Sequence, residues 1–559
     1  MPVLWHPLFI GTEPTMDFLR TDGQRIINES GDEVILSGYA LGNWMIQEAF
    51  LFGTGGFSAD FKPFMRAQGM DRGRTIDRII SELAGEEYAR SFWPRYHRAF
   101  VTADDIRLMA DMGMNSVRVP LNARLFLREG PGYQWNEESF STLANLLAWC
   151  EQAGIYAILD LHAAVGGQST IGCDDEWDNQ PHLFTDRESW ERTCVLWEEF
   201  ARRYGNLACV AGYELLNEPL ALPAFDRLDG ELLRFYDECI GRIRAIDRRH
   251  IIFLQGHRFA HRSDLLRPDM DPVAHNWCLA MHIYETLPDL GLIGPILAER
   301  ERLGVPVWVG ESGGAAAWGT VLYEMLRQYH IGTNVWVYKA VWRPNAPTLV
   351  TYEVPDGFDE IVRYANEGGP RPGFERSARI FDAYIDKTRL VNCAIHEEEA
   401  RAMLRGAGAV VPAIGYDAVP GRGKSFEGSY PYCAYCGYRR EDPMEFVLDE
   451  GVAPYDVEFA KLAGVPKYGD YPRLSLRLHE GDFACYTFRG LPTGATLSVS
   501  ARSSRNGTLG VEVCKQAASF EVDGIEWTSF QAPVTSSGDV VVKLSCARGT
   551  VDVKSLCIR

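Results

Sequence analysis

The sequence predicts an α/β fold, an eight-stranded (β/α)8 TIM barrel, followed by a C-terminal all-β sandwich domain of jelly-roll type. From about residue 24 to residue 390, short β-rich apolar runs alternate with amphipathic helical stretches. This alternation is typical of parallel strands joined by crossover helices. Helical periodicity disappears after about Cys393, and from Tyr471 onward alternating runs are separated by turns that contain glycine, which favours a β-sandwich.

The first domain contains eight candidate strands. They are residues 34–39, 116–119, 156–161, 212–216, 251–254, 279–284, 307–309 and 334–338. Helical patterns with apolar residues at three-to-four spacing lie between them, at residues 104–112, 140–153, 187–204, 234–246 and 319–329. Before the first strand, residues 23–38 have the pattern of a hairpin around Gly31-Asp32, which we expect to close the floor of the barrel.

Length and composition indicate two or three folded domains. The chain has 559 residues, which is longer than a single hydrophobic core usually supports. We expect residues 1–392 to form the barrel, residues 393–430 a linker or wrapping segment rich in Gly, Pro and Tyr, and residues 431–559 the β-sandwich.

Charge and hydropathy exclude several classes of partner. A net charge of -20 repels a phosphate backbone, so we expect no nucleic acid. No run of 18 uncharged apolar residues occurs, so we expect no membrane insertion. Thirteen cysteines without framework spacing and no secretory signal at the start favour a cytoplasmic protein with reduced thiols, or a secreted one if a signal has been removed. The oligomeric state is open.

Two short motifs do not indicate a metal or a cofactor. Cys433 and Cys436 form a lone C-x-x-C without a matching second pair. The GTGGF segment at residues 53–57 does not follow a strand and is not followed by Lys-Ser/Thr. We therefore expect no metal and no cofactor.

Polar residues close many of the strand-like runs. In (β/α) barrels the active site is built from residues at the carboxyl ends of the strands. The side chains expected to converge there are those of Arg118, Asp160, His162, Asn217, Glu218, His282, Tyr284, Glu311, Trp336, Tyr338 and Lys339.

Glu218 and Glu311 have the chemistry that cleavage of an acetal needs. One carboxylic acid protonates the leaving oxygen, and one carboxylate stabilises or traps the oxocarbenium-like centre. A single strand-end glutamate is equally well a salt bridge or a loop cap, but two in this context favour catalysis. Arg118 and Tyr284 could then keep Glu311 ionised, and Asn217 could donate to a sugar 2-hydroxyl.

Two tryptophans have two readings each. Trp336 could form a platform for a sugar ring or belong to the core. Trp527, in the C-terminal domain, could stack on a sugar, although an inward-facing core position is the commoner use of such a residue.

The ordered motifs NSVRVP, LDLH, ELLNEP, HIY, VGES and VWVYK, spread over about residues 34–390, resemble glycoside hydrolase family 5. The resemblance implies retention by double displacement, with Glu218 as acid/base and Glu311 as nucleophile. It also implies sugar-binding roles for Arg118, His162, Asn217, His282, Tyr284 and Trp336.

Within that family, LGNWMIQE, LDLHAAVGGQ and ELLNEPL resemble the exo-β-1,3-glucanase branch, which contains β-glucosidases and lies near endoglycoceramidases. This resemblance implies that Glu48 contacts hydroxyls of the terminal sugar. The loop after Gln168 departs from the pattern, so Asp174 and Asp175 are only candidates for subsite contacts. The C-terminal tract resembles carbohydrate-binding β-sandwich modules.

The expected activity is hydrolysis of a β-glycosidic bond, with a glucosidic bond as the first expectation, at a chain end of small glycosides or oligosaccharides. Two alternatives remain open. The chain could be an endo-acting β-glucanase or glycoceramidase-like enzyme on larger substrates. It could also be a catalytically silent sugar-binding protein. The β-sandwich could bind sugar or only brace the barrel.

Overall fold

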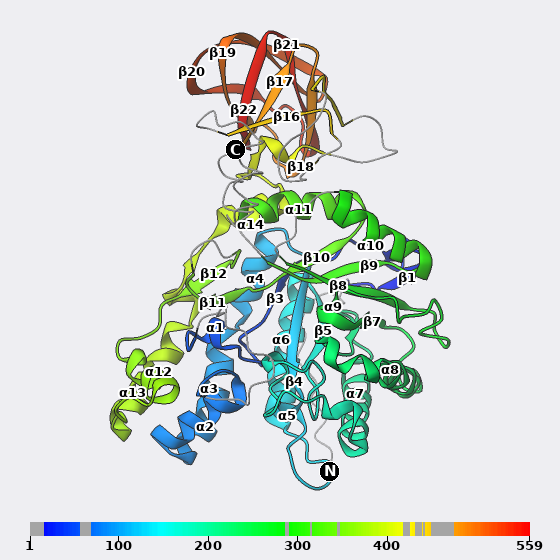
Figure 1. Cartoon of the computed structure of the whole chain (residues 1–559), viewed down its shortest axis with the longest axis vertical. Helices are drawn as coiled ribbons and strands as arrows, with labels where there is room; N and C mark the ends of the chain where they lie inside the picture. The colour runs from blue at the N-terminus through cyan, green and yellow to red at the C-terminus, as the bar shows by residue number, and fades with distance from the viewer. Residues whose placement is uncertain are drawn as a thin grey trace.

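The computed structural model describes residues 16–55, 69–284, 290–313, 316–343, 347–417, 425–430, 439, 442–448 and 474–559. Eight parallel strands form a closed barrel in the order β10-β3-β4-β5-β6-β7-β8-β9 (Figure 1). The predicted TIM barrel is therefore confirmed. Cys433 and Cys436 lie outside the described residues, as do the last two residues of the GTGGF segment.

Each predicted barrel strand is present, with ends that shift by a few residues. The strands are β3 (Ser37–Ala40), β4 (Ser116–Asn122), β5 (Tyr156–Ala163), β6 (Val210–Glu214), β7 (Ile251–Gln255), β8 (Trp277–Tyr284), β9 (Val307–Gly313) and β10 (Gly332–Val335). All eight are buried at every described position or at all but one, as strands covered on both faces must be.

The helices around the barrel include all five that the periodicity predicts. These are α4 (Ala103–Asp111), α6 (Glu137–Ala153), α7 (Arg187–Tyr204), α8 (Asp229–Arg244) and α11 (Ala316–Gln328). The structure adds α1 (Ala49–Phe52), α2 (Gly73–Ala84), α3 (Glu86–Phe100), α5 (Ala123–Phe126), α9 (His257–Ala260), α10 (Leu290–Leu303), α12 (Phe358–Glu367), α13 (Phe374–Lys387) and α14 (Glu397–Leu404). Short 3-10 turns are η1 (Gly172–Asp174), η2 (His182–Phe184), η3 (Pro223–Leu228), η4 (Leu390–Asn392) and η5 (Ala413–Gly415).

A hairpin precedes the barrel, and its paired strands lie around a turn at Gly23, earlier in the chain than the predicted Gly31-Asp32 turn. Strands β1 (Arg20–Asp22) and β2 (Arg25–Ile27) pair around Gly23, and the chain then folds back through Gly31 so that Ile27 bridges Glu33. Leu19 and Ile26 belong to the same buried cluster as inward-facing strand residues such as Phe253 and Trp308. The hairpin thus closes the barrel floor, as expected.

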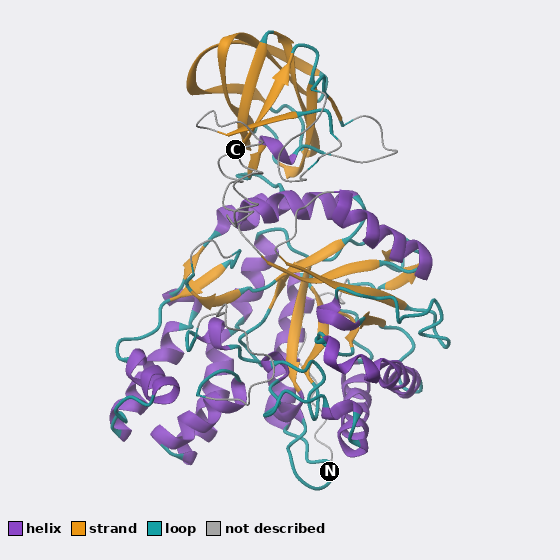
Figure 2. Ribbon diagram, in the orientation of Figure 1, coloured by secondary structure: helices purple, strands orange, loops and turns teal. Residues whose placement is uncertain are grey.

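The C-terminal domain is one curled antiparallel sheet, drawn as the orange strands at the top of Figure 2. Its strands are β14 (Val410–Pro412), β15 (Phe426–Glu427), β16 (Glu445–Leu448), β17 (Leu474–His479), β18 (Phe483–Leu491), β19 (Thr496–Val513), β20 (Gln516–Pro533), β21 (Gly538–Arg548) and β22 (Thr550–Ile558). The first part of β19 pairs with β22 and its second part with β21. The sheet therefore folds over itself along β19, and alternate apolar residues face the enclosed core. The predicted all-β domain is confirmed.

The segment between the domains is structured where it is described. It contains β13 (Ala394–Ile395), which completes a three-stranded sheet with β11 (Lys339–Val341) and β12 (Val350–Tyr352). Strands β14 and β15, which fall inside the predicted linker, pair with β22 and β18 of the C-terminal sheet. Within the part of the chain that the structure describes, no helix combines the length and apolarity required to cross a membrane.

Candidate active site

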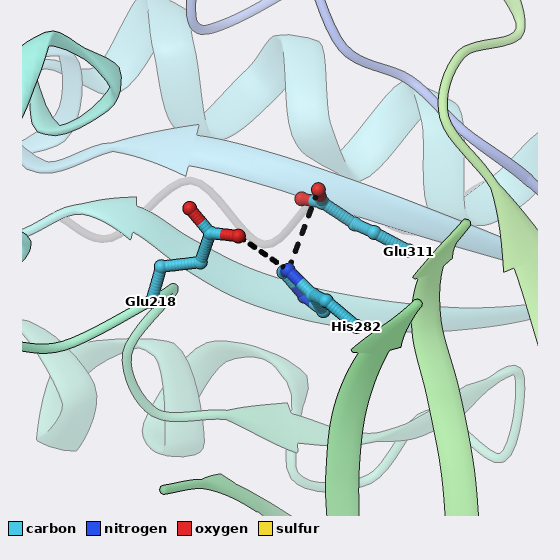
Figure 3. A group of neighbouring side chains, drawn as sticks. All are labelled: Glu218, His282 and Glu311. Atoms are coloured by element: carbon cyan, nitrogen blue, oxygen red, sulfur yellow. Dashed lines mark hydrogen bonds and ion pairs between the residues drawn. The ribbon is translucent and has the colours of Figure 1, made fainter. Parts of the chain in front are cut away.

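Glu218 and Glu311 face each other at the carboxyl ends of the strands, with His282 between them (Figure 3). One carboxylate oxygen of each glutamate and a ring nitrogen of His282 all lie within 4.8 Å of one another. His282 and Glu311 are register partners on β8 and β9, directly after an irregularity in the pairing at Met281. Such irregularities often re-aim side chains beside active sites.

Arg118 on β4 binds the charged groups beneath the catalytic pair. It is fully buried and makes ion pairs with Glu311, with Glu214 at 2.6 Å and with Asp160 at 2.9 Å. Its Nη2 also donates to Asn217 Oδ1 at 2.7 Å. The expected contact between Arg118 and Glu311 is present, and the guanidinium fixes the Asn217 amide as well.

Glu311 is held in its ionised form. Burial acts to raise the pKa of Glu311, but the electrostatic effects of His282, Arg118 and His162 lower it to about 2. The hydroxyl of Tyr284 adds to this by donating to Oε2 of Glu311 at 2.6 Å. A carboxylate with this pKa is ready to act as a nucleophile at neutral pH.

The hydrogen bonds of Gln255 define which nitrogen of His282 carries the proton. Gln255 Oε1 accepts from the backbone N–H of Glu218 at 2.6 Å, so its Nε2 is the atom 3.0 Å from His282 Nε2. Because an amide N–H donates, His282 Nε2 must accept. The proton is then on Nδ1, which donates to Glu218 Oε1 at 2.8 Å.

His162, Asn217 and Trp336 form a second wall. His162 Nδ1 lies 2.8 Å from Asp160 Oδ2, and its Nε2 lies 3.3 Å from Asn217 Nδ2. The indole of Trp336, directly after β10, stacks on the His162 ring with a 5.2 Å centroid distance and a 7° interplanar angle. Trp336 is 7% exposed and packs in a cluster with Ala40 and Leu51, so it has a core position beside the site, and its role as a sugar platform stays a prediction.

Glu48, at the start of α1, is the third carboxylate of the site. Burial is the largest cause that raises its pKa to about 7, and Glu311 and Glu218 act in the same direction. Its side chain hydrogen-bonds Trp336. Glu48 therefore lies close to the catalytic pair, and its pKa allows it to be protonated or ionised near neutral pH.

Four of the residues weighed in the sequence do not reach the site. Barrel strand β10 ends at Val335, so Tyr338 bonds Asp105 and the buried Lys339 ammonium donates to carbonyls of Phe100 and Thr388. Expecting these two at the site was wrong. The other two are the buried Asp174 and Asp175, whose oxygens serve the chain itself.

Trp527 is not a core residue. It lies partly exposed on β20, with the guanidinium of Arg502 4.3 Å from its ring centroid and the Lys554 ammonium at 5.9 Å. The interpretation of Trp527 as a core residue was wrong, because most residues around it on β20 are exposed to solvent and do not pack into the interior of the sheet.

Comparisons with known proteins agree with this geometry. Residues 81–341 match the family described as cellulase (glycosyl hydrolase family 5). The barrel belongs to glycoside hydrolase family 5. Family 5 relatives include a β-xylosidase of Phanerodontia chrysosporium, 30% identical over 53% of this chain and 62% of its own length. A glucan 1,3-β-glucosidase of Lachancea kluyveri is 27% identical over 40% of this chain and 50% of its own length.

The chain thus spans between half and two thirds of the length of these two relatives. Among solved structures, an endogalactoceramidase aligns over 97% of this chain and 100% of its own with a TM-score of 0.45 and 13% identity. A β-glucanase of Saccharophagus degradans aligns over 69% of this chain and 98% of its own with a TM-score of 0.40 and 16% identity.

Three residues of the family 5 site were not singled out in the sequence. Glu214 lies inside β6 and bonds Arg118 and Gln255. Gln255 ends β7, and Gln168 ties the backbone carbonyls of His162 and Asn217 together at 2.9 and 2.8 Å. A charged residue inside an apolar strand, and a polar residue at the end of β7, are the signals that could have identified Glu214 and Gln255.

The trio Glu218, His282 and Glu311 also has the composition of a metal site. Arg118 and Tyr284 already bond both oxygens of Glu311. The family 5 arrangement therefore suits proton transfer and nucleophilic attack better than metal ligation.

Proposed function

We propose that the protein is a retaining β-glycosidase that releases a terminal β-linked sugar, most plausibly glucose, from small glycosides or oligosaccharides. The observation that carries the proposal is the proximity of Glu218 and Glu311, which place one carboxylate oxygen each within 4.8 Å of the other; this is compatible with the shorter of two known spacings. Retaining glycosidases hold their carboxyl groups about 5 to 5.5 Å apart, whereas inverting ones need about 6.5 to 9.5 Å to admit a water.

The proposed first step is attack by Glu311 on the anomeric carbon. Glu218 donates a proton to the leaving oxygen, so that an ester bond to Glu311 forms as the glycosidic bond breaks. In the second step Glu218 takes a proton from water, and the water oxygen displaces Glu311.

Action on a terminal sugar is supported by the third carboxylate. Glu48 bonds Trp336 and interacts electrostatically with both catalytic glutamates, so polar and aromatic groups line the catalytic centre on this side as well. Relatives named as a β-xylosidase and as glucan 1,3-β-glucosidases support a single sugar unit, either glucose or xylose, as the released product.

The decisive experiment removes each glutamate separately. Glu218→Ala and Glu311→Ala should each lower kcat/KM on an aryl β-glucoside by at least about a thousandfold. Azide should restore turnover only in Glu218→Ala, giving a β-glycosyl azide, because only that variant still forms the ester. Wild-type-like activity of either variant would refute the assignment, and no turnover by the wild type on any β-glycoside would favour a silent sugar-binding protein.

The position of cleavage is tested with β-linked oligosaccharides labelled at the reducing end. Stepwise shortening by one sugar is expected of a terminal-acting enzyme. Internal products at early time points would instead favour the endo-acting alternative, and comparison of aryl β-glucoside with aryl β-xyloside identifies the sugar.

A further inference from the structure

A second cluster of ligand-type side chains lies outside the catalytic pair, where the loops that follow β6 and β7 meet. It consists of Asp226 in η3, Asp229 at the start of α8 and His257 at the start of α9. One ligand atom from each of the three lies within 4.8 Å of the other two. Asp226 and Asp229 are three residues apart and His257 comes from a separate loop, so no sequence motif indicates the three together.

Two atoms of this cluster are buried without a hydrogen-bond partner. They are Nδ1 of His257 and Oδ1 of Asp229, which lie 3.2 Å apart. His257 is only 4% exposed. A buried polar atom left unpaired costs about 1–3 kcal/mol, so these two atoms, 3.2 Å apart, must share either a proton or a metal ion.

Asp264 defines the orientation of the histidine. Its Oδ1 lies 3.4 Å from Nε2 of His257, on the opposite side of the ring from Asp229. If Nε2 carries the proton for Asp264, the lone pair on Nδ1 points at the Asp229 carboxylate. A carboxylate behind a metal-binding histidine is the usual way in which proteins fix that tautomer.

We propose that Asp226, Asp229 and His257 bind one divalent transition-metal ion, of the Zn²⁺, Co²⁺ or Mn²⁺ class. Tetrahedral metal–ligand bonds of about 2.0–2.1 Å place neighbouring ligand atoms about 3.3 Å apart, close to the 3.2 Å between His257 Nδ1 and Asp229 Oδ1. An imidazole ligand favours these ions over Mg²⁺ and Ca²⁺, which prefer sites made of oxygen alone.

The charges around the cluster admit a cation. Asp226 also pairs with Arg258 at 2.6 Å, and Asp264 pairs with Arg262 at 3.0 Å. A carboxylate has about four lone-pair positions, so Asp226 can serve the guanidinium and the metal together. Three carboxylates against two guanidinium groups leave a net negative charge beside the neutral imidazole.

The bound ion would join two loops that frame the acid/base glutamate. Arg258 donates its backbone N–H to the carbonyl of Leu220, two residues after Glu218. Arg258, Phe259 and Ala260 have φ angles of 58°, 58° and 56°, a left-handed run that is costly for residues with a Cβ. An ion held at His257, the residue before this run, would stabilise the loop in that conformation.

The test measures metal binding directly, independently of glycoside hydrolysis. The full chain is stripped with EDTA and titrated with ZnCl2 and CoCl2, with calorimetry, elemental analysis and the visible spectrum of Co²⁺ as readouts. One equivalent should bind and raise Tm as metal is added. Asp229→Asn and His257→Gln should remove binding, and Asp264→Asn should weaken it by about 10- to 100-fold.

His182→Gln is the matched control, because His182 is an exposed histidine that pairs with an aspartate at 3.1 Å, and it should leave binding intact. Asp226→Asn tests the site without disturbing the fold, because the Asp226 side chain is 48% exposed. The substitution should weaken metal binding without lowering the Tm of the EDTA-treated protein. Binding of no metal, or equal binding by wild type and Asp229→Asn, would overturn the proposal. An imidazolium signal from His257 in the presence of excess Zn²⁺ would do the same.

Discussion

A single buried arginine organises the charges of the catalytic centre. Arg118 contacts three carboxylates, those of Asp160, Glu214 and Glu311, and buried charged groups need a partner of opposite charge. This explains why a strand that is otherwise apolar carries an arginine at 0% exposure. The negative charge of Glu311 therefore depends on the buried strand residues that contact it.

Tyr284→Phe tests this control of charge. The substitution removes the hydroxyl that donates to Glu311 at 2.6 Å and keeps the ring. Because a hydrogen bond to a charged group contributes about 1.5–3 kcal/mol, the pKa of Glu311 should rise by about 1–2 units. The acid limb of the kcat/KM profile should move to higher pH. Tyr323→Phe, which loses a bond to Ser312 instead, should leave that limb in place; an unmoved limb in Tyr284→Phe would contradict the assignment.

Glu48 gives a second pH-dependent prediction. Its pKa is about 7 in the folded protein and 4.5 as the ordinary value, so the folded state binds more protons between these pH values, and stability falls as pH rises through that window. Glu48→Gln should therefore be more stable than wild type above pH 7 and nearly equal to it below about pH 4.5. Thermal unfolding between pH 4 and 9 measures this, with Glu375→Gln, 89% exposed, as control. A stability difference independent of pH would refute it.

The two carboxylates that face each other in the site could be predicted from the sequence, whereas the buried residues that support them could not. Glu218 and Glu311 were recognisable because two carboxylates that end separate strands meet at the carboxyl face of a barrel. Glu214 and Gln255 act through contacts across neighbouring strands, which the spacing along the chain does not reveal. Tyr338 and Lys339 were misplaced because β10 ends at Val335, so the residues after Trp336 leave the barrel.

At the scale of elements, the barrel strands were easier to predict than the helices that lie between β3 and β4. Buried parallel strands have continuous apolar runs, and all eight were found. Helices α2 and α3 lie in a long insertion between β3 and β4. This insertion lacks the regular spacing between strands from which helices could be predicted. The chain does fold back at the predicted Gly-Asp turn, but the two paired strands lie around an earlier turn at Gly23, which has a φ of 56°.

The hairpin should contribute measurably to stability. Ile26 is 7% exposed and packs into the floor cluster with Phe253 and Trp308. Ile26→Ala should lower the free energy of unfolding by about 2–5 kcal/mol, because it leaves a cavity where the barrel is otherwise closed. Ile525→Ala, at a position 69% exposed, should change it by less than about 0.5 kcal/mol. Urea unfolding distinguishes the two, and equal effects would mean that the hairpin does not close the floor.

At the scale of the whole molecule, the barrel and the C-terminal sheet are joined by a buried ion network. Glu324 on α11 is 3% exposed and accepts from Arg489 of β18 at 2.8 Å. Arg405, which follows α14, lies 3.7 Å from Glu324 and 3.2 Å from Asp417. Helix α11 connects β9, which carries Glu311, to β10. The position of the C-terminal sheet is therefore linked through one helix to the strand that holds the nucleophile.

Glu324→Ala should destabilise this junction strongly. Removing the carboxylate leaves Arg405 and Arg489 without their shared counter-ion, and breaking a buried pair in this way costs about 3–5 kcal/mol. Burial raises the pKa of Glu324 but the two arginines lower it overall, so the wild-type contribution is present above the ordinary value of 4.5 and is lost as pH falls below it. Calorimetry at pH 7 should show the loss, and the difference between variant and wild type should shrink toward pH 3. Glu521→Ala, which removes an exposed pair with Arg548, should cost less than about 1 kcal/mol; a similarly small effect of Glu324→Ala would show that the two domains are held together by other contacts.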